Sequence, residues 1–176
     1  MKTAGGILAA FAAASGALAQ EAPYVDPGMK KIAQVAIVCK DIEACSQRWA
    51  RMLGIQPAPI RTTLPGRQVR MIVHGKPSDA QVKLAFFNTG DATLELLQPV
   101  GGPSSWQDFL DQNGEGVQHV AFNVVDLDKT IASLAQQGMP VIHRGRYDTD
   151  DGEYVYVDSR SKLGVIIELL HSDQRP

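Results

Sequence analysis

Residues 32–42 (IAQVAIVCKDI) and residues 117–127 (VQHVAFNVVDL) are two copies of one pattern, in which an apolar run ends in an aspartate. The copies share one register, so that Gln34 of the first aligns with His119 of the second. Aspartate is a favoured N-cap, and a helical pattern follows it in both copies. A repeat of this kind predicts two equivalent half-structures that bury a face against each other.

Each copy continues through a helix into further strands. The helices should end at Gly54 and Gly138, because glycine readily adopts the left-handed conformation of a C-cap. The positions expected to face the core are Ile42, Cys45, Trp49 and Met52 in the first helix, and Leu127, Ile131 and Leu134 in the second. The later strands are expected at residues 69–73, 82–87 and 93–97 in the first copy, and at 141–143, 154–157 and 165–170 in the second.

The predicted fold class is therefore α+β, with two tandem βαβββ modules that pair into a curved mixed sheet around a central cleft. The modules span residues 31–98 and 116–171, and residues 99–115 join them through a loop and a short helix near 105–111. A linker at residues 20–30 precedes the first module, and residues 172–176 form a tail.

The composition allows a buried core. The chain has 176 residues, of which 44% are hydrophobic and 20% charged, unlike a disordered protein. The net charge of −2 gives no sign of the basic surface by which proteins bind nucleic acids, so no nucleic-acid partner is expected.

The first 19 residues have the pattern of a secretory signal peptide. Lys2 is the only charge before Glu21, residues 5–17 are small and apolar, and residues 17–19 (ALA) suit signal peptidase. We expect cleavage before Gln20, the alternative being an N-terminal helix that stays on the protein. No second apolar run reaches membrane length, so the mature protein is expected to be secreted or periplasmic and free of the membrane.

The two cysteines have two readings. Cys39 should lie near the end of a strand and Cys45 on the helix that follows. In an oxidising compartment they could form a disulfide, and they could equally be two buried thiols.

Strand alternation sorts the side chains of the repeated strand into two faces. One face carries Gln34 and Ala36 in the first copy, and His119, Ala121 and Asn123 in the second. Both copies thus place a side chain that can bind a metal beside a small alanine, which leaves room for a ligand. Asn123 shares this face and is a candidate substrate-binding residue.

Two glutamates occupy matching positions in the closing strands. Glu95 lies within LELL (residues 94–97) and Glu168 within IELL (residues 167–170), and a carboxylate in an apolar layer needs a cation or a donor. Pseudo-twofold pairing of the halves would bring them to Gln34 and His119. An imidazole, two carboxylates and an amide oxygen suit one divalent ion (Zn, Ni, Co, Mn or Mg), so the cleft is predicted to bind a metal.

Three further segments carry a family resemblance. Residues 104–110 (SSWQDFL), 114–122 (GEGVQHVAF) and 164–170 (GVIIELL) resemble methylmalonyl-CoA epimerases and their relatives in the vicinal oxygen chelate superfamily. The resemblance covers roughly residues 31–171.

The order of the four polar residues is instead similar to eukaryotic-type glyoxalase I. That similarity implies a metal held by Gln34, Glu95, His119 and Glu168, with Glu168 also able to move protons. Members of the superfamily often pair, so the resemblance also allows a homodimer.

The chain departs from both families at positions tied to their substrates. Epimerases have a further catalytic glutamate in the middle of the first module, whereas no acidic residue lies between Glu43 and Asp79 here. Glyoxalase I holds glutathione with an arginine and an asparagine, and the corresponding residues here are Val38 and Pro99. The resemblance therefore implies the superfamily's chemistry without naming the substrate.

We expect a metal-dependent lyase or isomerase, glyoxalase-like or epimerase-like, that acts on a small carbonyl or hydroxy-acid substrate. The metal would stabilise an enediolate formed by proton abstraction next to a carbonyl. Glu168 is the first candidate for the catalytic base and Glu95 the second. The alternative is a non-catalytic protein of the same fold that binds and sequesters a small molecule, although such proteins usually lose the metal ligands.

Other polar residues are harder to assign. Arg70, in a cluster with Arg61 and Arg67, could meet an anionic substrate, or the three could form a solvated basic loop. The histidines without a partner in the repeat are expected to be structural or exposed: His74, His143 and His171.

Overall fold

The two copies of the repeat form equivalent strand–helix units. The first gives β1 (Ile32–Val38) and α1 (Ile42–Leu53), and the second gives β7 (Gly116–Asn123) and α3 (Leu127–Gln136). Asp41 and Asp126 cap the helices, each side chain accepting a hydrogen bond from a backbone N–H three residues later.

The computed structural model describes residues 26–174. The predicted signal peptide (residues 1–19), its cleavage site and most of the linker lie outside the described residues, as do the last two residues of the tail. No helix among the described residues is long and apolar enough to cross a membrane.

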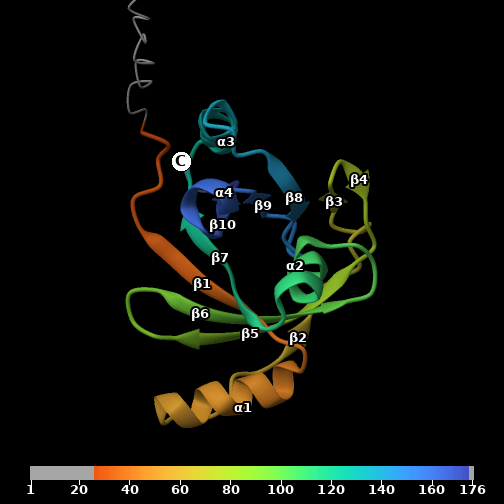
Figure 1. Cartoon of the computed structure of the whole chain (residues 1–176), viewed down its shortest axis with the longest axis vertical. Helices are drawn as coiled ribbons and strands as arrows, with labels where there is room; N and C mark the ends of the chain where they lie inside the picture. Colours follow the sequence, from red (N-terminus) through yellow and green to blue (C-terminus); the bar gives the residue numbers. More distant parts are fainter. Residues whose placement is uncertain (1–25, 175–176) are drawn as a thin grey trace, which may run out of the picture.

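Within the described residues, the remaining strands complete one ten-stranded sheet, which curls into a half-barrel (Figure 1). They are β2 (Arg61–Thr62), β3 (Ile72–Val73), β4 (Lys76–Pro77), β5 (Gln81–Asn88), β6 (Thr93–Val100), β8 (Val141–Arg146), β9 (Gly152–Val157) and β10 (Ile166–Ser172). The order across the sheet is β2-β5-β6-β1-β7-β10-β9-β8-β3-β4. The first and last long strands of each module pair in parallel, and β1 and β7 join the modules in antiparallel fashion. The α+β fold and the curved mixed sheet are thus confirmed.

Helices cover the sheet from outside and close one part of its concave side. α1 packs on β5 and β6, α3 packs on the strands of the second module, and the two lie on opposite sides of the molecule in Figure 1. Between the modules, α2 (Ser105–Asn113) contacts β6, β1 and β7 and buries Trp106 in the concave core. The short α4 (Arg160–Leu163) connects β9 to β10.

The strand predicted at residues 69–73 is wrong in extent and in partner. Val69 and Arg70 lie in turns, and only Ile72 and Val73 are extended. Together with β4 they form a hairpin that pairs with β8 of the second module, Ile72 lying opposite Arg144. Arg70 (φ 54°) precedes this hairpin, and His74 (φ 48°) lies in its turn, so both adopt the left-handed conformation of tight turns. The segment between β2 and β5 therefore crosses from one module to the other.

The face of the first helix is correct except at its end. Ile42 and Cys45 are buried and Trp49 is half-buried, but Met52 is 63% exposed. The buried stripe is centred nearer Ser46 and Ala50, which leaves Met52 beyond its edge. The structure also decides between the two readings of the cysteines, because Cys39 and Cys45 form a disulfide that ties the end of β1 to α1.

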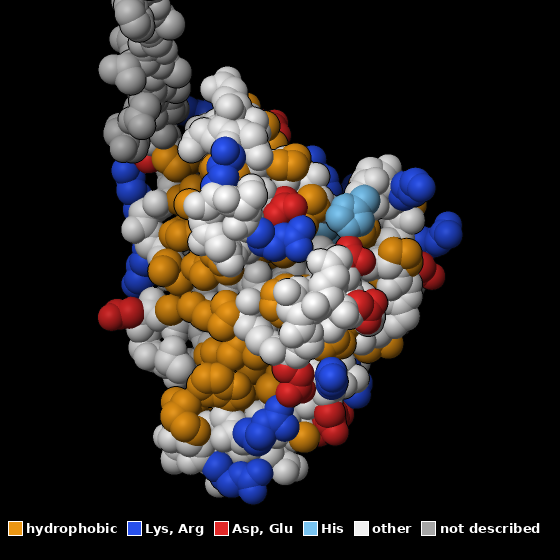
Figure 2. Space-filling view, in the orientation of Figure 1, with side chains coloured by type: hydrophobic (Ala, Val, Ile, Leu, Met, Phe, Trp, Pro, Cys, Tyr) orange, Lys and Arg blue, Asp and Glu red, His pale blue; other side chains and the backbone are white. Residues whose placement is uncertain are grey.

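The surface shown in Figure 2 has a hydrophobic part and a charged part. Hydrophobic side chains gather on the side where β1 and α1 lie, and charges of both signs are interspersed elsewhere on that face. The exposed hydrophobic residues include Ile32 on β1 and Val117 on β7, which are strands that pair with each other.

Candidate metal centre and its cavity

The four central strands bring together the four residues that the repeat singled out. In the sheet register, Ala36 lies between Glu95 of β6 and His119 of β7. Ala121 lies between Gln34 of β1 and Glu168 of β10 in the same way. Both alanines are fully buried, and their small side chains leave the space into which the larger neighbours point.

Three of these side chains form a compact group of metal-ligand type. The Nε2 atom of His119 lies 3.3 Å from Oε2 of Glu95 and 3.1 Å from Oε2 of Glu168. One ligand atom from each residue lies within 4.8 Å of the others, and all three residues are buried. This spacing suits a single ion bound by one nitrogen and carboxylate oxygens.

The same three atoms are among the buried side-chain atoms that have no hydrogen-bond partner within residues 26–174. Oε2 of Glu95, Nε2 of His119 and Oε2 of Glu168 are buried and have no partner with hydrogen-bond geometry. Buried polar atoms in native proteins almost always have a partner, and unpaired carboxylates are especially costly. A divalent cation would satisfy all three atoms at once, so the residues present fit the metal that the fold family implies.

The electrostatics of the group also favour positive charge at its centre. Burial by itself lowers the pKa of His119, but the carboxylates of Glu168 and Glu95 outweigh it and raise that pKa to about 9. Burial raises the pKa of Glu95, and the neighbouring Glu168 adds to the effect. A proton and a metal ion therefore compete for the same place.

Gln118 is a residue of this site that the sequence reasoning missed. A β-bulge inserts it into β7, since Ala36 pairs with His119 while the next residue of β1 pairs with Val117. The bulge brings the Gln118 side chain to its neighbour, where Nδ1 of His119 hydrogen-bonds to Oε1 of Gln118. With Nδ1 as the donor, Nε2 keeps its lone pair for a cation. Regular alternation would have put Gln118 on the opposite face.

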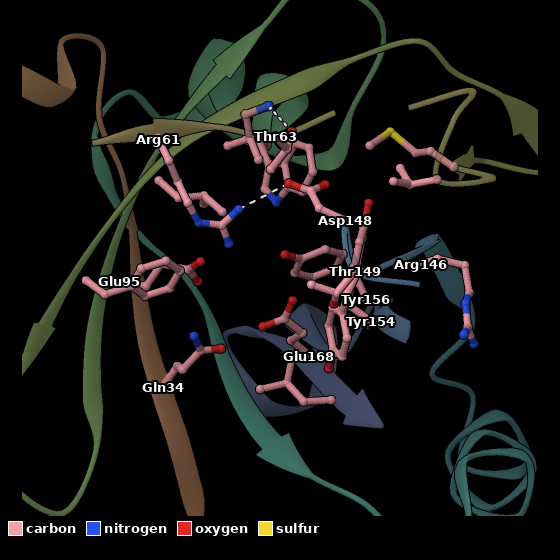
Figure 3. Close-up of a pocket in the computed structure, with 18 residues that line it drawn as sticks. Gln34, Arg61, Thr63, Glu95, Arg146, Asp148, Thr149, Tyr154, Tyr156 and Glu168 are labelled. Atoms are coloured by element: carbon pink, nitrogen blue, oxygen red, sulfur yellow. Dashed lines mark hydrogen bonds and ion pairs between the residues drawn. The ribbon is translucent and has the colours of Figure 1, made fainter. Parts of the chain in front are cut away.

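A cavity of about 420 Å³ opens above this group. Gln34, Glu95 and Glu168 line it from the central strands, and their side chains face one another in Figure 3. Its walls are mainly apolar and aromatic: Val69, Met71, Val82, Leu84, Phe86, Trp106, Tyr147, Tyr154, Tyr156 and Leu170. Such a mixture of apolar walls and a few convergent polar groups is typical of a small-molecule site.

Tyr154 and Tyr156 were also not predicted, although the sequence held a signal for them. They lie two residues apart on β9, so they share a face, and Tyr156 is directly opposite Glu168. Burial raises the pKa of both phenols, and the carboxylate of Glu168 adds to the shift, so both stay protonated. Neutral hydroxyl groups of this kind can donate hydrogen bonds to a bound ligand.

The two residues predicted to bind substrate lie elsewhere. Asn123 is exposed at the end of β7 and does not line the cavity. Arg70 pairs with Asp150 and does not line the cavity. Of the arginine cluster it is Arg61 that lines the cavity.

The other histidines divide as expected between surface and core. His74 is exposed and lies 2.8 Å from Oδ2 of Asp108, and His171 is partly buried. His143 is fully buried, with Nδ1 2.9 Å from Oγ of Ser105 and the ring against Trp106. Burial lowers the pKa of His143 to about 3, so its ring is neutral.

Comparison with known proteins agrees with this geometry. A protein-family model described as the Glyoxalase/Bleomycin resistance protein/Dioxygenase superfamily matches residues 33–157. The chain is 30% identical over 92 residues to the uncharacterized protein YqjC of Bacillus subtilis (strain 168), a match that covers 52% of this chain and 66% of YqjC. It thus spans just under two thirds of YqjC. It is 23% identical over 141 residues to mitochondrial methylmalonyl-CoA epimerase of Mus musculus, covering 79% of this chain and 71% of that enzyme.

Solved structures show the same fold. Methylmalonyl-CoA epimerase from Mycobacterium tuberculosis superposes with a TM-score of 0.60 at 21% identity, covering 88% of this chain and 94% of that one. The Streptomyces coelicolor epimerase in complex with 2-nitronate-propionyl-CoA gives 0.58 at 23% identity, covering 82% of this chain and 98% of the other. At these identities the likeness concerns the fold.

Proposed function

Because the chain belongs to the glyoxalase/bleomycin resistance protein/dioxygenase superfamily, we propose that it is a metal-dependent lyase or isomerase. Its substrate would be a small carbonyl or hydroxy-acid compound that loses a proton next to a carbonyl. The observation that carries the proposal is the group of three unsatisfied ligand atoms, on Glu95, His119 and Glu168, at the base of an apolar cavity.

The metal would be held by Gln34, Glu95, His119 and Glu168. When bound, a divalent ion would supply Lewis-acid polarisation of the substrate oxygens. The amide oxygen of Gln34 reaches the same part of the cavity in Figure 3, which supports it as the fourth ligand.

The proton transfer would fall to the carboxylates of the chain. Glu168 is our candidate for the base, because it lines the cavity and lies directly opposite Tyr156 in the sheet. Glu95 faces it from the other module and is the second candidate. The phenol of Tyr156, which stays protonated, would donate to a substrate oxygen, and the apolar walls would exclude water from the reacting carbon.

The relation to methylmalonyl-CoA epimerases supports isomerase-type chemistry. The residues of this chain, however, favour a substrate other than that of the epimerases. Solved relatives are described in complex with methylmalonyl-CoA or 2-nitronate-propionyl-CoA. In this chain no carboxylate from residues 44–78 can serve as a second base, because that stretch has no acidic residue. We therefore place the proton transfer on the two glutamates of the metal group.

The proposal is tested by metal content and by proton exchange. Elemental analysis of the purified protein should find about one divalent ion per chain, lost in Glu95→Ala and His119→Ala. The loaded protein, incubated in D₂O with a panel of 2-oxo and 2-hydroxy acids, aldehydes and ketones, should catalyse deuterium incorporation next to the carbonyl, as followed by NMR.

Glu168→Gln should slow that exchange by about 100-fold or more while the far-UV circular dichroism is unchanged. The matched control is Glu43→Gln, on the exposed side of α1, which should exchange like the wild type. Unchanged exchange in Glu168→Gln would remove this residue as the base. A loaded wild-type protein that exchanges no member of the panel, and only binds some of them, would favour the sequestering function instead.

We also propose that the mature protein is exported, and that it can form a homodimer. The Cys39–Cys45 disulfide supports an oxidising compartment. Sequencing the mature N-terminus should find Gln20 first, and a retained Met1 would contradict export by cleavage. Sedimentation analysis of the purified protein decides between monomer and dimer.

A further inference from the structure

Among residues 26–174, one cationic side chain of the cavity keeps most of its donors available for a ligand. Two arginines, Arg61 and Arg146, line it. The donors of Arg146 are already paired within the protein, because its guanidinium bonds to Asp150 and to both carboxylate oxygens of Asp173. In Figure 3 the Arg146 side chain also points away from the glutamates.

Arg61 is held differently. Its Nη1 donates to Oδ2 of Asp148 at 3.2 Å, and within residues 26–174 no other hydrogen bond of this side chain is formed. The guanidinium lies over the ring of Phe86, 5.7 Å from the ring centre, and the side chain is 56% exposed. A guanidinium has five N–H donors, so a single contact with Asp148 leaves the rest of the fork for a planar anion.

Asp148 fixes the position of Arg61. Its second oxygen, Oδ1, accepts from the backbone N–H of Leu64 at 3.2 Å, which anchors the carboxylate to the segment that follows β2. Arg61 is therefore held at the cavity from two sides, by this carboxylate and by Phe86. In Figure 3 its guanidinium points toward the neighbouring Glu95.

The cavity thus offers two kinds of polar group within mainly apolar walls. Glu95 and Glu168 reach it from the central strands, and the guanidinium of Arg61 reaches it from β2. A ligand that meets both needs oxygens for the ion and a separate anionic group for the guanidinium. A carboxylate is the group that pairs with guanidinium through two parallel hydrogen bonds.

We propose that the substrate is a small, largely apolar oxo or hydroxy acid whose carboxylate is separated from the reacting carbonyl and is bound by Arg61. This proposal rests on the proposed function for the other end of the substrate, but its own requirement is the anion. A cavity of about 420 Å³ lies in the lower part of the size range of small-molecule sites, which suits an acid of this size.

The test compares acids with neutral partners of nearly the same shape. The probes are 4-oxopentanoate, 4-oxoheptanoate and 4-oxo-4-phenylbutanoate, each paired with its dimethylamide. Binding to the Zn-loaded full-length mature protein is measured by equilibrium dialysis with quantitation of the free probe. At least one acid should bind about tenfold more tightly than its amide, as expected for a charge-assisted pair.

Variants of the cluster supply the controls. Arg61→Gln should bring the acid-to-amide ratio close to 1 with zinc content unchanged, and Arg61→Lys should retain part of the preference. Arg67→Gln, which alters an exposed neighbour that does not line the cavity, should bind like the wild type. The proposal is overturned if no acid binds, if acids and amides bind equally, or if the preference survives in Arg61→Gln.

The outcome is separable from that of the proposed function. Acid binding through Arg61 without deuterium exchange would support this inference and count against the enzyme. Exchange on neutral ketones with no preference for acids would support the enzyme and count against this inference.

Discussion

The imidazole of His119 is oriented by one side-chain neighbour. Gln118 Oε1 bonds to its Nδ1, and Gln118 Nε2 in turn donates to the backbone oxygen of Ser105 at 3.3 Å. The chain of contacts links His119 to Ser105 at the start of α2. Partners of this kind set the tautomer and the angle of a ligating histidine.

We therefore expect Gln118→Leu to weaken metal affinity by about 10- to 100-fold without unfolding the protein. The substituted side chain is close in volume but cannot accept from Nδ1, so the ring loses its orientation. Zinc affinity measured by competition with a chromophoric chelator gives the result, and Gln112→Leu, at an exposed position of α2, is the control. Equal affinity in both variants would contradict a role for Gln118.

His143 predicts an acid-sensitive stability. Burial lowers its pKa in the folded protein to about 3, whereas an exposed histidine has a pKa near 6.5, so the unfolded chain binds a proton first as the pH falls. The stabilisation is complete above pH 6.5 and is lost as the pH falls towards 3. The slope should be about 1.4 kcal/mol per pH unit within this window.

Urea unfolding at pH 7, 6 and 5 measures this slope. In His143→Phe the free energy of unfolding should fall less steeply than in the wild type, because phenylalanine cannot take up a proton in the unfolded state. Parallel curves for wild type and His143→Phe would refute the assignment.

The segment between β2 and β5 is the element that completes the cavity. It contributes Val69 and Met71 to the wall and carries the hairpin that pairs with β8. The backbone N–H of Gly66 donates to the carbonyl of Ala80, which fastens the start of this crossing to the start of β5.

Gly66 allows that close approach. A Cβ at this position would lie 2.6 Å from the carbonyl oxygen of Ser78 and 3.0 Å from that of Ala80. We expect Gly66→Ala to destabilise the protein by about 1–3 kcal/mol and to weaken probe binding, since the backbone must shift. Gly116→Ala is the control, because its Cβ would meet only the Phe109 ring at 3.8 Å. Urea unfolding of both variants measures the difference, and equal stability would show that the crossing is loosely held.

Binding of one ion should stabilise the molecule as a whole. Glu95 comes from the first module, and His119 and Glu168 come from the second, so an ion would bridge the two halves. Free metal at 100 times its dissociation constant stabilises the folded state by about 2.7 kcal/mol. The chelator EDTA should therefore lower the melting temperature of the loaded wild-type protein by several degrees. His119→Ala should melt at the same temperature with and without EDTA. If EDTA leaves the melting temperature of the wild-type protein unchanged, the ion does not bridge the two modules.

The sequence by itself determined the frame and the polar residues that meet at its centre. The two copies of the repeat predicted β1 and β7, their Asp-capped helices and the pairing of the modules, because periodicity and capping are local properties of the chain. The same repeat selected Glu95, His119 and Glu168, since polar residues at matching positions of two equivalent halves must meet at the axis between them. That these residues hold a metal and move protons stays a prediction.

Tertiary structure alone decided what surrounds that group. The bulge that brings the Gln118 side chain next to His119 breaks strand alternation, and no pattern in the sequence predicts it. The crossing of residues 63–77 to β8 depends on a strand edge supplied by distant sequence, as does the choice of Arg61 over Arg70 for the cavity. Local pattern sets which side of a strand a residue faces, but only the assembled sheet fixes which loops and edges come to lie beside it.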